Sequence, residues 1–171
     1  MSRQGKPKSA GGAPRRVSPV KIRHASGADA QSIADLMIRT KKLNNEFDPL
    51  FAVVKEARLK AEKFASDSLR DGALLVVASD GPKVVGVLRA EIRERMFYEP
   101  SKEGFITDFY ILPEFRRKAL GHRILDQASA ELKKMGAQIV VAEVPSQNEI
   151  AVRFYTKRGF RSLVQHFGRT F

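Results

Sequence analysis

A short turn in the second half of the chain carries three consecutive cationic side chains just before a helix-forming pattern. It reads Arg116-Arg117-Lys118-Ala119-Leu120-Gly121. A loop that enters a helix presents unpaired backbone N–H groups and the positive end of the helix dipole, so cationic residues there favour a phosphate-bearing ligand. A basic turn is also common on plain solvated surface, and the residues of the turn alone leave both interpretations open.

The flanking segments predict the elements that would position this turn. Residues Phe105 to Leu112 are rich in aromatic and β-branched side chains and end at Pro113, which indicates a buried strand. Apolar residues then recur at helical spacing, so we expect a helix from near Ala119 to Gly136. The turn therefore joins a buried strand to an amphipathic helix.

Two motifs resemble those of the GNAT family of N-acetyltransferases. Arg116 and Gly121 match its acyl-CoA motif, (Gln/Arg)-x-x-Gly-x-(Gly/Ala), whereas Ala119 stands at the first glycine position. The run from Asn148 to Phe160 matches the family's closing helix, Asn-x-x-Ala-x-x-Phe-Tyr-x-x-x-Gly-Phe, without a gap. The resemblance covers about residues 20 to 167 and implies acetyl-CoA as co-substrate.

By that resemblance, the strand, the turn and the start of the last helix would bind acetyl-CoA. The end of the strand would pair with the pantetheine arm, and the backbone amides of the turn would hold the pyrophosphate. Asn148 would bind the CoA arm or orient the loop, and it is also suited to cap the last helix. The expected cofactor-binding residues are Tyr110, Ile111, Leu112, Arg116, Arg117, Lys118, Ala119, Leu120, Gly121, His122 and Asn148.

Acetyl transfer from a thioester to an amine needs a neutral nucleophile, a stabilised oxyanion and a proton for the leaving thiolate. The resemblance implies Tyr155 as proton donor, although outside the motif it would be read as a core tyrosine. A backbone N–H of the strand that ends at Leu112 is the expected oxyanion donor. Glu143 is the candidate base, because its spacing to Asn148 and Tyr155 resembles the ribosomal-protein alanine N-acetyltransferase branch. Asp108 is a second candidate.

The acceptor amine is left open. About one α-amine in seven is neutral at pH 7, against about one lysine in 2,500. A basic protein also suits a ribosome-associated substrate better than a polycation, so a protein or peptide N-terminus is the leading hypothesis. A small amine such as a polyamine is the alternative, with Glu46 and Asp48 as substrate-binding residues by resemblance or as a plain capping turn. A non-catalytic CoA sensor or RNA- or ribosome-binding module is the hypothesis of another class.

Composition bounds the possible cofactors. The chain has 171 residues, a net charge of +12 and no cysteine, which excludes a disulfide framework and a Cys-ligated metal site. Its histidines are widely separated, so no metal is expected; they are His24, His122 and His166.

Residues 1–17 are basic and rich in glycine and proline, which predicts a disordered tail with weak RNA or ribosome association or with no partner. Residues 18–171 are expected to form the acyl-CoA N-acyltransferase domain. No apolar run approaches the length of a membrane span, so we expect no membrane partner and a cytoplasmic location. For the oligomeric state, both a monomer and a homodimer are left open.

The order of predicted elements indicates the fold class. It runs β-α-α-β-β-β-α-β-α-β, with a last strand from Phe160 to about Phe167 and a bulge near Gly86. As in the GNAT fold, this order implies an α/β protein with a mixed, mostly antiparallel central sheet and helices on both faces.

Overall fold

The computed structural model of the protein describes residues 19–116 and 119–171, so the predicted tail, Arg117 and Lys118 lie outside it. The strands are β1 (Lys21–His24), β2 (Leu74–Asp80), β3 (Lys83–Glu94), β4 (Lys102–Ile111) and β5 (Ile139–Ala142). The α-helices are α1 (Ala30–Phe47), α2 (Ala57–Arg70), α3 (Leu120–Lys134) and α4 (Glu149–Thr156). Short 3-10 helices are η1 (Gly27–Asp29), η2 (Pro49–Phe51) and η3 (Pro113–Phe115).

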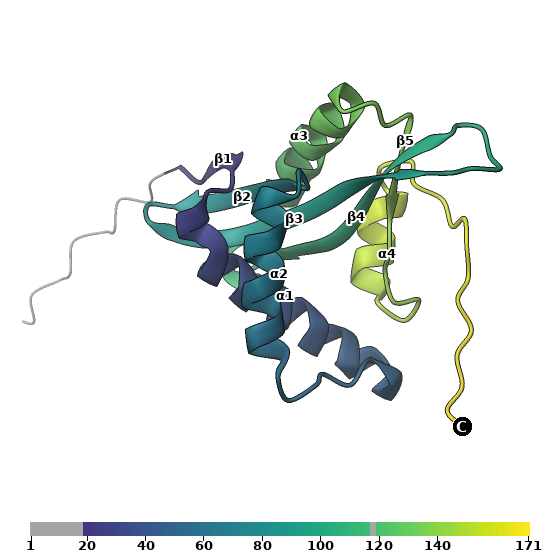
Figure 1. Ribbon diagram of the computed structural model, residues 1–171, viewed down its shortest axis with the longest axis horizontal. Coiled ribbons are helices and arrows are strands. Elements are labelled where there is room, and N and C mark those ends of the chain that lie inside the picture. Colours follow the sequence, from purple (N-terminus) through teal and green to yellow (C-terminus); the bar gives the residue numbers. More distant parts are fainter. Residues whose placement is uncertain (1–18, 117–118) are drawn as a thin grey trace, which may run out of the picture.

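The strands form one sheet in the order β1-β2-β3-β4-β5. Neighbours from β1 to β4 are antiparallel, and β5 alone is parallel to its neighbour β4. Helices α1 and α2 cover one face of this sheet and α3 covers the other (Figure 1). The predicted fold class, a mixed and mostly antiparallel sheet with helices on both faces, is confirmed.

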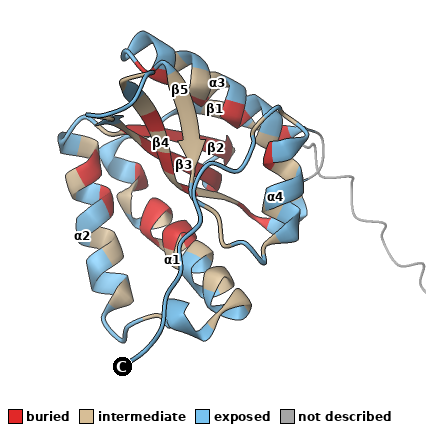
Figure 2. Ribbon diagram, turned by 90° about the vertical axis from the view of Figure 1, so that its right-hand side faces the viewer, coloured by how far each residue is buried: buried red, intermediate tan, exposed pale blue. Residues whose placement is uncertain are grey.

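The core lies where both faces of the sheet are covered, and Figure 2 shows the buried residues gathered there. Strand β2 is buried over nearly its whole length, as expected from the run of five apolar residues with which it begins. Helix α3 buries one stripe at helical spacing against the sheet, as its sequence predicts. That stripe consists of Leu120, Ile124, Leu125, Ala128 and Leu132.

The predicted strand from Phe160 to Phe167 does not form in this chain, and that prediction was wrong. Residues 160–171 contain no helix or strand. A strand needs a neighbouring edge to supply its hydrogen bonds, and this segment instead passes the connection between α1 and α2. There a Cβ built on Gly168 would lie 3.4 Å from Leu50 Cδ1.

Two register shifts bend the central strands. Between β2 and β3, Ala78 pairs with Gly86 and Ser79 with Val84, which places a bulge beside Gly86, as predicted. Between β3 and β4 the register shifts again, and Thr107 is left without an opposing residue. A bulge re-aims the side chains around it, so this second shift decides where Asp108 points.

Asp29 ties the start of the first helical segment to β1. Its carboxylate accepts hydrogen bonds from Arg23 Nη1 at 2.7 Å, Arg23 Nη2 at 2.8 Å and the Ser26 backbone N–H at 2.7 Å. Ser26 and Asp29 thus form a capping box at the start of η1. The guanidinium of Arg23 holds the pKa of the Asp29 carboxyl well below its ordinary value, despite the opposing effect of burial.

We expect Asp29→Asn to lower the free energy of unfolding at pH 7 by about 1–3 kcal/mol, because it removes the buried, charged acceptor of the hydrogen bonds from Arg23 and Ser26. The pKa of Asp29 is lower in the folded than in the unfolded protein. The carboxylate therefore stabilises the folded state at pH values above the unfolded pKa of about 4, and this stabilisation is lost as the pH falls towards the folded pKa. The difference between variant and wild type should therefore shrink at pH 3 in urea titrations. Asp35→Asn is the control, since its pair with Arg58 is half-exposed, and it should change stability by less than about 1 kcal/mol. Equal losses in both variants would contradict this account.

Ala119 lies in a left-handed backbone conformation, with φ of 57°, directly before α3. It is the sole non-glycine residue with positive φ in ranges 19–116 and 119–171. An L-residue with a Cβ pays about 1–2 kcal/mol for this conformation. The family motif has glycine at this position, and the backbone geometry supplies a physical reason for that preference.

We expect Ala119→Gly to raise the free energy of unfolding by about 0.5–1 kcal/mol, because relief of the steric cost exceeds the added unfolded-state entropy. Urea titration measures the change. Ala130→Gly, at an exposed interior position of α3, is the matched control and should lower stability by about 0.5–1 kcal/mol. If both glycines destabilise the protein alike, Ala119 does not hold the left-handed conformation in solution.

Candidate active site

The edge of β4 that faces β5 is paired only along its first half. The parallel ladder ends at the pair of Ile106 with Ala142, and the Glu143 N–H lies 3.4 Å from the Ile106 carbonyl. From Thr107 to Ile111, β4 has no strand neighbour on that side among the described residues. This is the stretch whose backbone was expected to pair with an extended ligand arm.

One backbone group of that stretch is already used. The Leu112 N–H donates to the Val85 carbonyl at 2.9 Å, so it is not available to an oxyanion. Successive N–H groups of a strand point to opposite sides, so the N–H of Tyr110, which pairs with Val87, also faces β3. Of the predicted oxyanion donors, the Ile111 N–H is the one that faces the open edge.

Arg116 connects the turn to the end of β4. Its Nε donates to the Ile111 carbonyl at 3.0 Å, and its guanidinium carbon lies 5.4 Å from the centre of the Tyr110 ring. The side chain therefore fixes the loop to the strand. The predicted ligands Arg117 and Lys118 lie outside the described residues.

Helix α3 begins at Leu120, as the sequence predicts, and its first turn packs against α4. A Cβ built on Gly121 would lie 3.0 Å from Phe154 Cε2, so a side chain at Gly121 would push the two helices apart. The His122 ring meets the Phe154 ring edge-on, with centroids 6.1 Å apart. The glycine of the motif thus has a packing role in addition to its expected place near phosphate.

A cavity of about 330 Å³ opens between this turn of α3 and α4. Its lining residues are His122, Ile150, Arg153, Phe154, Lys157 and Arg158. Arg158 donates from Nη1 to the Phe154 carbonyl, and its guanidinium carbon lies 3.8 Å from the centre of the Phe154 ring. Sequence reasoning missed the cations of α4, although Arg153 and Lys157 are spaced to share one helix face.

These residues fit a phosphate-rich co-substrate. The first turn of α3 offers backbone N–H groups, and the cavity beside it is lined by cationic side chains. Asn148 caps α4, because its side-chain oxygen accepts from the Ala151 N–H at 3.1 Å. One of the two predicted roles of Asn148 is thus confirmed, and its contact with a CoA arm stays a prediction.

Tyr155 is buried on the inner side of α4. It is 8% exposed, and its ring meets Phe154 and Phe160 edge-on at centroid distances of 5.2 and 5.1 Å. Burial raises the pKa of the Tyr155 phenol above its ordinary value, and the charge of Arg158 opposes this only in part. The phenol therefore keeps its proton at neutral pH.

Asp108 lies on β4 beside the bulge and faces α1. Its side chain is 3% exposed, and Lys41 Nζ of α1 lies 2.7 Å from Oδ1. The contact is an ion pair and lacks the alignment of a hydrogen bond. Lys41 was not predicted, because nothing local in the sequence connects α1 with β4.

Arg89, opposite Asp108 in β3, is also buried. Its Nε donates to Ser68 Oγ at 2.8 Å. Its Nη1 lies 2.8 Å from Glu91 Oε2 and 3.0 Å from Thr107 Oγ1. The bulged Thr107 is thus held by an arginine that also anchors α2. Sequence reasoning missed Arg89, whose only local signal is a cation inside an apolar strand.

The other predicted carboxylates lie apart from this pair. Glu143 follows β5 and is exposed, and Glu46 is exposed near the end of α1. Asp48 Oδ1 accepts from the Leu50 N–H at 2.8 Å, so it caps η2. In the described part of the chain, none of the three forms a hydrogen bond or ion pair with Asp108 or Tyr155.

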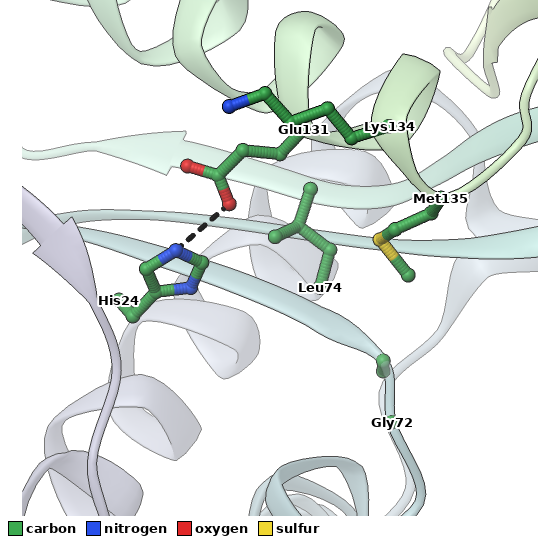
Figure 3. A pocket seen from close by; sticks show the side chains of 7 residues that line it. His24, Gly72, Leu74, Glu131, Lys134 and Met135 are labelled. Atoms are coloured by element: carbon green, nitrogen blue, oxygen red, sulfur yellow. Dashed lines mark ion pairs between the residues drawn. The ribbon is translucent and has the colours of Figure 1, made fainter.

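A second cavity, of about 480 Å³, lies where the end of α3 approaches β1 and β2 (Figure 3). His24 Nε2 and Glu131 Oε2 lie 2.9 Å apart at its rim. None of the predicted site residues lines it. We therefore place the active site at β4 and α4, where the candidate acid, carboxylate and cofactor turn occur.

Two further features concern metals and membranes. Across residues 19–116 and 119–171, no three His, Asp or Glu residues are grouped so that they could hold a metal ion. Within the same ranges, no helix is both long and apolar enough to span a membrane.

Comparison with known proteins agrees with this geometry. The sequence profile of the Acetyltransferase (GNAT) family matches residues 40–160. An aminoalkylphosphonate N-acetyltransferase of Salmonella typhimurium is 25% identical over 152 residues, which cover 88% of this chain and 90% of that protein.

Solved structures share the fold. A protein from Clostridium acetobutylicum described as a predicted acetyltransferase, solved with acetyl-CoA, has a TM-score of 0.71 at 13% identity, over 88% of this chain and 96% of that one. An aminoglycoside N-acetyltransferase in complex with CoA has a TM-score of 0.68 at 15% identity, over 92% and 97%. With a family profile that spans most of the sheet, the cofactor turn and α4, this chain belongs to the GNAT family and is an acetyl-CoA-dependent N-acetyltransferase.

Proposed function

We propose that the protein acetylates the primary amine of a small acceptor that carries an anionic group, with Asp108 as general base and Tyr155 as general acid. The observation that carries this proposal is the ion pair of Lys41 with Asp108. A protein N-terminus, the leading hypothesis from the sequence, becomes the second candidate.

The pair supports an ammonium site next to β4. Asp108 is buried, yet a primary ammonium reaches it to within 2.7 Å. Lys41 is 51% exposed and its contact is poorly aligned, so an acceptor ammonium can take its place at little cost. A carboxylate at that position can then remove the proton that makes the amine unreactive.

The anionic group of the acceptor is supported by charge and by the curated relative. The chain has a net charge of +12, which attracts anions and repels polycations such as polyamines. On the face that carries Asp108, Arg89 is buried and stacks on Phe64, with its guanidinium carbon 4.4 Å from the ring centre. The 25% identical relative is named for aminoalkylphosphonates, which carry an amine and an anion together.

In the proposed reaction, acetyl-CoA supplies an activated acetyl group as a thioester. Asp108 takes one proton of the acceptor ammonium, the neutral amine attacks the thioester carbon, and the N–H group of Ile111 stabilises the negative charge on the carbonyl oxygen. As the C–S bond breaks, Tyr155 gives its phenolic proton to the leaving sulfur, and the second proton released by the nitrogen restores the phenol. Burial raises the pKa of the Tyr155 phenol, so the phenol still carries its proton when the thiolate leaves.

We expect Tyr155→Phe to lower kcat by about 100-fold or more while acetyl-CoA affinity stays within about twofold, because general-acid catalysis contributes about 10²–10⁴. Steady-state kinetics and calorimetric titration measure the two effects. Tyr98→Phe, on the exposed hairpin after β3, is the control and should leave both unchanged. Because the pKa of Tyr155 is raised, wild-type kcat should not fall on the alkaline side below about pH 10. A variant with full kcat would remove Tyr155 from the mechanism.

The acceptor is tested by the rate of thiol release with 2-aminoethylphosphonate, spermidine and a peptide with an N-terminal alanine. We expect the aminophosphonate to give the highest kcat/KM. With that acceptor, Asp108→Asn should lower kcat/KM by about 100-fold or more, and Glu143→Gln by less than about threefold.

The opposite result selects the second candidate. If the peptide is the best acceptor and Glu143→Gln is the damaging substitution, the protein works like the branch that its Glu143, Asn148 and Tyr155 spacing resembles. Loss of activity in both variants with unchanged KM would assign the two carboxylates a shared role.

A further inference from the structure

We propose that Lys41 is itself an acceptor, so that the protein transfers an acetyl group from acetyl-CoA to its own Lys41 Nζ when no free acceptor is bound. Lys41 is then a modification site on α1, and self-acetylation is a second activity of the same active site. This activity rests on the proposed function, because Asp108 is again the base.

The Lys41 ammonium lies where the nitrogen of an acceptor must lie. Its Nζ is 2.7 Å from Asp108 Oδ1, within the distance of about 2.6–3.2 Å over which a general base removes a proton. Among the described residues, Asp108 forms no other ion pair and Oδ1 accepts no hydrogen bond. The guanidinium of Arg89, opposite Asp108 in β3, is hydrogen-bonded elsewhere. The carboxylate is therefore free to act on Lys41.

Helix α1 directs Lys41 toward the sheet. Ile33 and Met37 lie on the inner face of α1 and are 0% and 3% exposed. Lys41 continues this series with a spacing of four residues, so it lies on the same face of the helix. Lys42 is the next residue, is exposed, and forms no ion pair with a described carboxylate. The two neighbouring lysines thus differ in their access to Asp108.

Its attachment beside the base compensates for the low reactivity of a lysine. About one lysine side chain in 2,500 is neutral at pH 7. An amine that is held next to the catalytic groups reacts at an effective concentration that a dissolved lysine does not reach. The Lys41 side chain is nevertheless 51% exposed, so a free acceptor can displace it. Self-acetylation is therefore slow and occurs mainly when no acceptor is present.

The reaction needs only the established co-substrate. Asp108 takes one proton of the Lys41 ammonium, and the neutral Nζ attacks the thioester carbon of acetyl-CoA. As the C–S bond breaks, Tyr155 gives its phenolic proton to the leaving sulfur, and the second proton released by Nζ restores the phenol. The products are an acetylated Lys41, the free thiol of CoA and one proton on Asp108, which passes to solvent.

Acetylation of Lys41 would close the site to other acceptors. The acetylated side chain has no charge, so Asp108 loses the ion pair that it forms with Lys41. The acetamide group also remains where the nitrogen of a free acceptor must bind. Chains that meet acetyl-CoA without an acceptor would thus become inactive.

Peptide mass spectrometry of the full-length protein, incubated with acetyl-CoA and no acceptor, tests the proposal. We expect acetylation of Lys41 at a rate at least about tenfold higher than that of Lys42. Lys41→Arg keeps a cation beside Asp108 and should abolish this modification, whereas Lys42→Arg should leave the rate at Lys41 unchanged. Asp108→Asn should slow acetylation of Lys41 by about 100-fold or more. Calorimetric binding of acetyl-CoA shows that each variant is folded.

Two further readouts separate self-acetylation from other routes. The rate constant at Lys41 should not change when the protein is diluted about tenfold, because the amine and the site belong to one chain. A rate that rises with protein concentration would mean transfer between copies and would overturn the proposal. Turnover of a free acceptor should fall in proportion to the acetylated fraction, and full turnover by acetylated protein would show that Lys41 does not occupy the acceptor position.

Equal rates at Lys41 and Lys42, or equal rates at Lys41 in wild type and Asp108→Asn, would indicate spontaneous reaction with the thioester and overturn the proposal. Thiol release with a free acceptor tests the proposed function separately. If Asp108→Asn slows that turnover but wild-type Lys41 stays unmodified, self-acetylation alone is ruled out. If Asp108→Asn leaves the turnover unchanged, the proposed function fails and self-acetylation fails with it.

Discussion

The active site depends on the point at which β4 and β5 separate. Their parallel ladder ends at Ile106 and Ala142, and the bulge at Thr107 follows at once. If the ladder continued, the backbone groups of Ile111 would be hydrogen-bonded to β5. Because it stops, this edge of β4 stays open, and the bulge turns Asp108 toward Lys41 of α1. Two adjacent irregularities thus provide an open edge and a buried carboxylate.

Local patterns in the sequence predicted the parts of the site that local structure creates. The strand before the turn, the start of α3 and the cap at Asn148 each follow from residues within a few positions of one another. The contact of Lys41 with Asp108 joins α1 to β4, and that of Arg89 with Ser68 joins β3 to α2. Residue spacing predicts contacts only between residues close in sequence, so these two contacts became visible only in the folded structure.

The C-terminal segment, residues 160–171, shows a different limit of prediction. Its apolar and β-branched residues favour a strand, and this preference is real as a property of the segment. A strand, unlike a helix, takes its hydrogen bonds from another part of the protein. Whether Leu163 and Val164 become a strand is therefore decided by which edge they reach. The sequence of the segment shows a preference for the strand conformation, but it does not show which strand edge would pair with it.

The two substrates carry opposite charges, and the residues proposed to bind them lie in different parts of the site. Acetyl-CoA is polyanionic, and three cations lie on α4 and directly after it, beside the first turn of α3: Arg153, Lys157 and Arg158. An acceptor ammonium needs a carboxylate, and Asp108 lies on β4 opposite α1. Gly121 keeps these cations beside the turn, because a larger residue would push Phe154 and α4 away from α3. Under the proposed function, the positive charge of the chain attracts the co-substrate, and the buried carboxylate of Asp108 binds the amine.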